Sequence, residues 1–321
     1  MPGSAVRAFT DPDEYQSFTC DAQHRVVITA PGVYRAQTTR IDLPRVTMRR
    51  AWQSLPSISH LAIPPGRSAI CFPLDGDQAS GIWGGRDVPS GGIFVVDSGG
   101  EFHSRAGAGG RWASLSLSAD ALAASAEAHV GGDLKFPAAM NVMRPRAAAM
   151  ARLLAVHKAA IELADTAPDI LERPEVATVI EENLMQAAIN CLTDPDTTNA
   201  RQPVRQSIIL RFENYLEANP DRPLHVLEVC AAVGVSERTL RMHCQAHLGI
   251  SPQRYLWLRR MHQVRRALAL ADAAQTTVTA VATDHGFWEL GRFSVAYRTL
   301  FGELPSATLR QPRHTKTRLV L

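Results

Sequence analysis

The chain has 321 residues, a length that favours two domains over one. Its hydrophobic content of 45% and charged content of 20% exclude collagen-like, coiled-coil and extensively disordered proteins. The charge is uneven, since residues 1–200 carry 17 Arg/Lys and 22 Asp/Glu, whereas residues 201–321 carry 17 and 9. A net charge of +8 on the second part suggests that it meets a polyanion.

The cysteines and the apolar runs exclude further classes. The five cysteines are scattered, without a C-x-x-C pair, so neither a disulfide framework nor a zinc site is expected. Residues 1–18 are polar and acidic, and no run of about 18 apolar residues occurs. We therefore expect a cytoplasmic protein that does not contact membranes.

Residues 1–193 predict one domain with a β-rich part at 25–118 and a helical part at 119–193. Short β-favouring segments such as VVITA (26–30) and GIFVVDS (92–98) alternate with Gly-Gly turns, as in a sandwich or barrel. Three Ala/Leu-rich helices follow, over 119–130, 145–164 and 174–192. The last has an apolar stripe that either packs on its own domain or forms a dimer interface; it consists of Val176, Val179, Ile180, Leu184, Ala187 and Cys191.

Residues 194–207 have two prolines and no apolar periodicity, which predicts a linker. Residues 208–321 read as helical throughout, which predicts a small all-α domain. The predicted fold class is therefore α+β with two domains.

The second domain contains a helix-turn-helix pattern at 226–248. An apolar helix stops at Gly234, which tolerates the left-handed backbone of a sharp turn. Ser236 can then cap a second helix. That helix would bury Leu240, Cys244 and Leu248 and leave a polar face outside, consisting of Glu237, Arg238, Arg241, Met242 and Gln245. This is the geometry that lets one helix enter the major groove of DNA.

The same pattern recurs at 278–301, with Gly286 in the place of Gly234. The buried face becomes Phe293, Tyr297 and Phe301, and the exposed set is Leu290, Gly291, Arg292, Ser294, Val295 and Arg298. A helix that starts at Ser251-Pro252 would join the units rigidly, so that two recognition helices enter successive major-groove segments about 34 Å apart. Its arginines either form a solvated face or contact phosphates; they are Arg259, Arg260, Arg265 and Arg266.

These landmarks resemble the AraC/XylS family of transcription regulators. The resemblance covers about 90 residues and rests on L-x-V-C-x-x-x-G-V-S-x-x-T-L at 227–240, LGISPQRYL at 248–256, A-x-x-x-G-F ending at 287 and FGELP at 301–305. The motif GFWELGRF (286–293) is also similar to that of the subset of the family that contains the ethanolamine-utilisation regulator. The resemblance implies a DNA-binding activator or repressor with a cupin-like β-domain for sensing and dimerisation.

The resemblance also implies where DNA is contacted. The expected residues are Ser236, Glu237, Arg238, Arg241 and Met242 in the first unit and Leu290, Arg292, Ser294 and Arg298 in the second. Gly291 has no side chain to read with, so we expect weaker base discrimination by the second unit, apart from Arg292. The expected partners are promoter DNA, a second copy of the chain, RNA polymerase and a small-molecule effector; no effector site is predicted.

Catalytic and metal patterns argue against an enzyme. His24, His60 and His103 stand apart rather than in the His-x-His cluster of metal-binding cupins, and no nucleophile elbow or phosphate loop occurs. Neither a cofactor nor a metal is expected. Asp97, Glu101 and His103 fall near one strand end, which we attribute to hairpin proximity. A small-molecule-responsive activator is favoured; the alternatives are a ligand-independent regulator controlled by a protein partner or expression level, and an enzyme fused to a DNA-binding domain.

Overall fold

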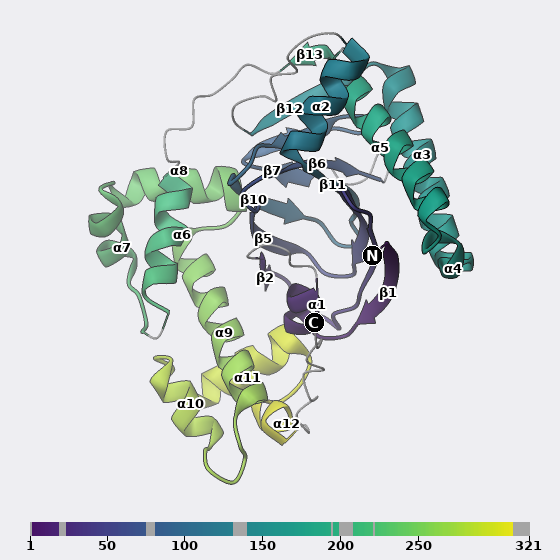
Figure 1. Cartoon of the computed structure of the whole chain (residues 1–321). Helices are drawn as coiled ribbons and strands as arrows, with labels where there is room; N and C mark the ends of the chain where they lie inside the picture. Colours follow the sequence, from purple (N-terminus) through teal and green to yellow (C-terminus); the bar gives the residue numbers. More distant parts are fainter. Residues whose placement is uncertain are drawn as a thin grey trace.

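The computed structural model of the chain describes residues 2–18, 24–74, 81–130, 140–193, 195–198, 208–220 and 222–310. An N-terminal part of two β-sheets and several helices is followed by a C-terminal part made of helices (Figure 1). The predicted α+β class is confirmed. Among the helices of these ranges, none has both the length and the apolar character needed to cross a bilayer.

The two sheets are antiparallel throughout. The larger has the order β1-β3-β4-β11-β6-β9-β12-β13 and the smaller the order β2-β5-β10-β7-β8. The strands of the larger sheet are β1 (Gly3–Phe9), β3 (Ala36–Asp42), β4 (Val46–Gln53), β6 (Arg67–Pro73), β9 (Ile93–Val96), β11 (Arg111–Ser118), β12 (Asn141–Pro145) and β13 (Pro195–Thr198). Those of the smaller are β2 (His24–Ile28), β5 (Ser57–Ala62), β7 (Gly81–Trp83), β8 (Arg86–Val88) and β10 (Glu101–Ala106).

The helices of the N-terminal part are α1 (Pro12–Phe18), α2 (Ala119–Val130), α3 (Ala147–Thr166), α4 (Pro168–Leu171) and α5 (Pro174–Thr193). Helices α2, α3 and α5 lie along the larger sheet (Figure 1), and one apolar core joins Met48, Ile70 and Leu115 of the sheet to Leu153 and Leu184 of the helices. The strands β1, β12 and β13 and the helix α1 lie outside the region predicted to be β-rich, because their sequences carry neither alternation nor turn residues of the kind that marked the other strands.

The apolar stripe of α5 divides between the two predicted roles. Leu184, Ala187 and Cys191 are buried in the core of the N-terminal part. Val179, by contrast, has 57% of its surface exposed, and Val176 is half-buried. The second half of the stripe, together with Ile180, therefore packs on its own domain, while Val179 faces outward.

The C-terminal helices are α6 (Ile208–Ala218), α7 (Val226–Val233), α8 (Glu237–Leu248), α9 (Pro252–Leu270), α10 (Val278–Asp284), α11 (Leu290–Phe301) and α12 (Pro305–Arg310). The pairs α7–α8 and α10–α11 occupy the two spans predicted from the sequence, 226–248 and 278–301. In the predicted linker, residues 195–198 are instead strand β13, paired with β12, because two prolines still allow an edge strand. Residues 194 and 199–207 of that linker, and residues 311–321 of the predicted DNA-binding domain, lie outside the described residues.

The apolar core of the helical part extends onto the N-terminal part. Val27 of β2 and Ile58 of β5 belong to the same buried cluster as Phe212, Tyr255 and Val264 of the C-terminal helices. Figure 1 shows α6, α8 and α9 beside β2, β5 and β10. The smaller sheet therefore covers an apolar surface of the helical part.

Candidate nucleic-acid interface

The first turn is built as its sequence indicates. Gly234 ends α7 in the left-handed region with φ of +72°, and its amide donates to the Cys230 carbonyl at 2.9 Å. The Ser236 hydroxyl oxygen accepts from the Thr239 amide at 3.2 Å, which caps α8. Leu240 and Cys244 are completely buried under α8. These contacts fix how α8 leaves the turn.

The outer face of α8 is open to solvent. All five residues predicted to contact DNA in this unit are exposed, namely Ser236, Glu237, Arg238, Arg241 and Met242. The Arg241 guanidinium lies 2.7 Å from the Glu237 carboxylate, four residues earlier on the helix. The Arg238 side chain, by contrast, forms no ion pair or hydrogen bond with another described residue. Arg238 therefore presents its donors outward.

The second unit also joins two helices at a glycine, but its side-chain cap lies at the start of the first helix, α10, and α11 has none. Gly286 follows α10 with φ of +78°, and the Thr277 hydroxyl oxygen caps the start of α10 by accepting from Ala280. Phe293 and Tyr297 of α11 are buried with ring centroids 5.6 Å apart. The predicted third buried residue, Phe301, is only half-buried and packs edge-on against His262 of α9.

The residues predicted to contact DNA from α11 differ in exposure. The Arg292 side chain is 84% exposed and is paired with Glu289 at 2.7 Å, and Arg298 is also exposed. Ser294 is half-buried. Leu290 is half-buried as well and packs against the apolar core, so most of its surface serves the fold. The two arginines are the residues of this set that stand out from the helix.

Sequence reasoning missed one exposed residue beside α11. Trp288 has 77% of its surface exposed just before the helix, and Val295, one turn into it, has 68% exposed. The aromatic residue in GFWELGRF was read only as part of a resemblance. A large apolar residue in a turn between two polar helix faces was the signal that could have singled it out.

Helix α9 holds the units apart and is fastened to the N-terminal part. Its 19 residues correspond to about 28 Å. Neither predicted role of its arginines applies to Arg259 and Arg265, which are 6% and 8% exposed. Arg265 contacts Asp11 at 2.8 Å, and Arg266 contacts Asp13 at 2.7 Å. These contacts join residues more than 250 positions apart, which no local pattern predicts.

A group of charged side chains, here called the interdomain polar cluster, lies between the sheets and the helices. It consists of Arg25, His60, His103, Glu213, Glu217 and Arg259. The rings of His60 and His103, from neighbouring strands, stack with centroids 4.7 Å apart. His103 therefore does not join Asp97 and Glu101 in a separate site; its Nε2 lies 3.2 Å from Oε1 of Glu213.

Glu213 is the centre of the interdomain polar cluster and has no exposed surface. Its Oε2 lies 3.4 Å from Arg25 and 3.6 Å from Arg259. Burial alone raises the pKa of this carboxyl, but the hydrogen bond and charge of His103, with Arg259 and Tyr255, hold the pKa at about 2. Glu213 is thus ionised at neutral pH and joins Arg25 and His103 of the N-terminal part to Arg259 of the C-terminal part.

No group of His, Cys, Asp and Glu in the described part of the chain has the arrangement of a metal site. The four cysteines placed by the structure are free and buried. Burial raises the pKa of the Cys71, Cys191 and Cys244 thiols to about 12, so these thiols are protonated and unreactive at neutral pH.

The C-terminal part matches known proteins. Residues 229–311 match a family model described as a helix-turn-helix domain. The chain is 40% identical over 109 residues to the "Probable thc operon regulatory protein" of Rhodococcus erythropolis, covering 34% of this chain and 33% of that protein. It is 36% identical over 101 residues to the XylDLEGF operon transcriptional activator of Pseudomonas putida, covering 32% of each. The chain thus spans about a third of the length of the curated relatives it matches.

Among solved structures, the AraC-like transcriptional activator CuxR aligns with 82% of this chain and 96% of its own, at 13% identity and a TM-score of 0.43. The family match and the two helix pairs joined at Gly234 and Gly286 define the C-terminal part as a helix-turn-helix domain. This domain is similar to those of AraC/XylS-type regulators.

Proposed function

We propose that the chain is a sequence-specific DNA-binding transcription regulator of the AraC/XylS type that acts as an activator. The observation that carries the proposal is the pair of helix-turn-helix units with exposed arginines on both second helices, Arg238 and Arg241 on α8 and Arg292 and Arg298 on α11. The rigid connection through α9 supports simultaneous entry into neighbouring major-groove segments. Promoter DNA and RNA polymerase would then be its partners.

Activation is proposed because several curated relatives are named transcriptional activators. One of them is the HTH-type transcriptional activator RhaS of Pectobacterium carotovorum, which is 26% identical over 128 residues. We also propose that the second unit belongs to the subset that contains the ethanolamine-utilisation regulator, because the motif GFWELGRF (286–293) is similar to the motif of that subset. A small-molecule effector bound by the N-terminal part is the favoured input. Control by a protein partner or by expression level is the alternative and requires no ligand.

The central test concerns Arg238. An arginine that donates to guanine O6 and N7 discriminates against other bases by about 1–3 kcal/mol, or roughly 5- to 150-fold in affinity. We expect Arg238→Ala to abolish the preference at one base pair of the half-site bound by the first unit. Binding of the wild-type chain and the variant to a footprinted promoter and its single-base substitutions, by fluorescence anisotropy, measures this effect.

Arg211→Ala is the matched control, because Arg211 is exposed on α6 outside both units and carries the same charge. The control should weaken all sequences equally and slightly. If Arg238→Ala also weakens every substituted promoter equally, Arg238 contacts phosphate and the proposed base reading is wrong. If the wild-type chain protects no promoter segment, the proposed function is wrong.

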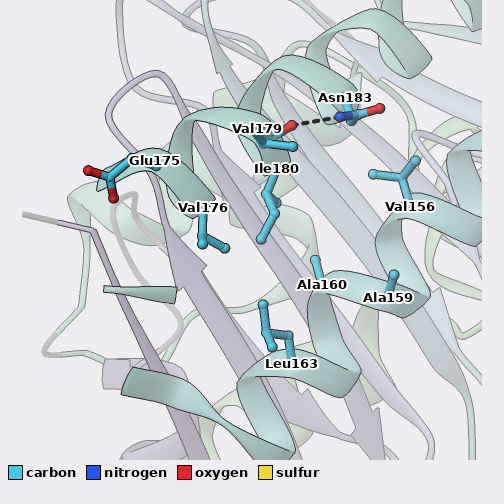
Figure 2. Close-up of a pocket in the computed structure, with 9 residues that line it drawn as sticks. All are labelled: Val156, Ala159, Ala160, Leu163, Glu175, Val176, Val179, Ile180 and Asn183. Atoms are coloured by element: carbon cyan, nitrogen blue, oxygen red, sulfur yellow. Dashed lines mark hydrogen bonds between the residues drawn. The ribbon is translucent and has the colours of Figure 1, made fainter. Parts of the chain in front are cut away.

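We also propose that the chain is a homodimer through α3 and α5. A groove of about 480 Å3 lies between these helices, and its lining is shown in Figure 2: Val156, Ala159, Ala160, Leu163, Glu175, Val176, Val179, Ile180 and Asn183. Arg152, which donates to Asn183, lies at one end and Glu175 at the other. A second copy related by a two-fold axis and running antiparallel would place the Arg152 end against the Glu175 end of its partner.

Val179→Glu tests this interface, because it places a charge in the middle of an apolar contact. We expect the variant to be monomeric at micromolar concentration where the wild-type chain is dimeric, as measured by sedimentation equilibrium. Val33→Glu is the control, since Val33 is 69% exposed in the segment between β2 and β3 and does not line the groove. A dimer that survives Val179→Glu, or a monomeric wild-type chain, contradicts the proposed interface.

A further inference from the structure

We infer that Trp288, Gly291 and Val295 form an apolar shelf through which the second unit reads the 5-methyl groups of thymine in the major groove. The inference rests on the proposed function and specifies the chemistry of base reading by α11. It differs from the expectation that Arg292 alone gives this unit its discrimination.

Trp288 has no packing role in the protein that accounts for its size. A residue in this position often packs on the first turns of the following helix as a hydrophobic staple. Here Phe287 already does so, since its ring centroid lies 5.0 Å from that of Phe293. Trp288 is left with 77% of its surface exposed, the largest exposed fraction among the large apolar residues that the structure describes. An indole held in water by a rigid turn indicates an external apolar contact.

Gly291 gives a second and independent indication. It lies in the first turn of α11, and a Cβ placed there would meet nothing within 4 Å. Glycine within a helix costs about 1 kcal/mol relative to alanine, and neither crowding nor a left-handed backbone requires it at this position. A bare backbone is instead useful where a base approaches the helix closely.

Val295 completes the shelf because it lies four residues after Gly291 on the same helix face. Its β-branched side chain is 68% exposed. Arg292 and Arg298 stand three residues to either side of it and are also exposed. An apolar centre with cations at its edges matches a major groove in which thymine methyl groups lie between two phosphate backbones. The occupant of this surface is therefore double-stranded DNA.

The shelf has a counterpart of different chemistry on α8, where the exposed residues at the start of the helix include Arg238 and Arg241. The first unit would read hydrogen-bond acceptors of guanine, and the second would read methyl groups. We therefore expect binding sites with guanine in one half-site and neighbouring thymines in the other.

The experiment removes only the methyl groups. Double-stranded DNA is selected from a random pool by the full wild-type chain, and each thymine of the half-site bound by α11 is then replaced by deoxyuridine. Loss of one contacted methyl should weaken the wild-type chain by about fourfold. Trp288→Ala and Val295→Ala should bind more weakly and lose the dependence on the corresponding methyl group. Leu270→Ala, which removes an apolar residue 59% exposed at the end of α9, should keep the dependence in full.

Gly291→Ala separates folding from recognition. We expect it to raise the thermal midpoint, because alanine stabilises a helix in open space, while it lowers affinity for the selected site. The inferred shelf alone is wrong if deoxyuridine leaves the affinity of the wild-type chain unchanged. It is also wrong if Trp288→Ala and Val295→Ala keep the full dependence on the methyl groups. A pool from which the wild-type chain enriches no sequence overturns the proposed function itself.

Discussion

Replacing Glu213 by glutamine is expected to lower the free energy of unfolding by about 3–5 kcal/mol, because it leaves buried cations without their shared counter-ion. The carboxylate has no exposed surface and lies within 3.6 Å of Arg25, His103 and Arg259. Glutamine keeps the shape and one acceptor, so the change isolates the charge. Urea denaturation at pH 7, followed by far-ultraviolet circular dichroism, measures the loss.

Glu217→Gln is the matched control within the same helix. Glu217 contacts Arg25 at 2.9 Å, but its side chain is 28% exposed, so solvent screens the pair. We expect its loss to cost at most about 1 kcal/mol. Equal and small effects of the two substitutions would show that the interdomain polar cluster contributes little to stability.

Acidification below pH 6.5 is expected to destabilise the protein through buried histidines. Burial lowers the pKa of His24 to about 3 and the pKa values of His157 and His262 to about 4. Nε2 of His262 lies 3.0 Å from the amide nitrogen of Ile28, a hydrogen bond that the ring accepts only when this nitrogen is unprotonated. Asp13 opposes this lowering at His262, whereas Arg265 and Arg266 add to it.

The sign follows from proton uptake. In the unfolded chain these rings bind protons below their ordinary pKa of 6.5, whereas in the folded chain they do so only near pH 3–4. Their stability contribution is therefore complete above pH 6.5 and is lost as the pH falls toward 4, by up to about 1.4 kcal/mol per pH unit for each ring. The stability contribution of the Glu213 carboxylate is lost only below its ordinary pKa of 4.5.

Urea denaturation at pH 7.5, 6.0 and 5.0 checks this expectation. His262→Gln should reduce the slope of the free energy of unfolding against pH by about one proton. A free energy of unfolding that is constant between pH 7.5 and 5.0 would show that these rings are not buried in the neutral form.

The turns of the two helix-turn-helix units could be predicted because their signals are local. Gly234 and Gly286 adopt the left-handed backbone expected of them, and Ser236 caps the helix that it precedes. Each effect acts over three or four residues, which a single sequence displays directly.

The joint between the two parts could not be predicted, because its contacts are distant in sequence. Arg25 meets Glu213 across 188 positions, and Arg265 meets Asp11 across 254. A glutamate or an arginine on a helix is most often solvated, so pattern alone assigns these residues to the surface. Trp288 was overlooked because it was considered only as part of the motif GFWELGRF, and its exposure depends on how the turn before α11 folds.

The shared core has a consequence for domain exchange. Val27 and Ile58 complete the apolar surface of the helical part, and Arg25 and His103 meet Glu213 beside them. A chimaera that joins this helix-turn-helix domain to the N-terminal half of a relative would retain its recognition helices but acquire a mismatched joint. Retargeting such a regulator to a new promoter therefore calls for changes confined to α8 and α11, where the exposed side chains can vary without disturbing the contact between the halves.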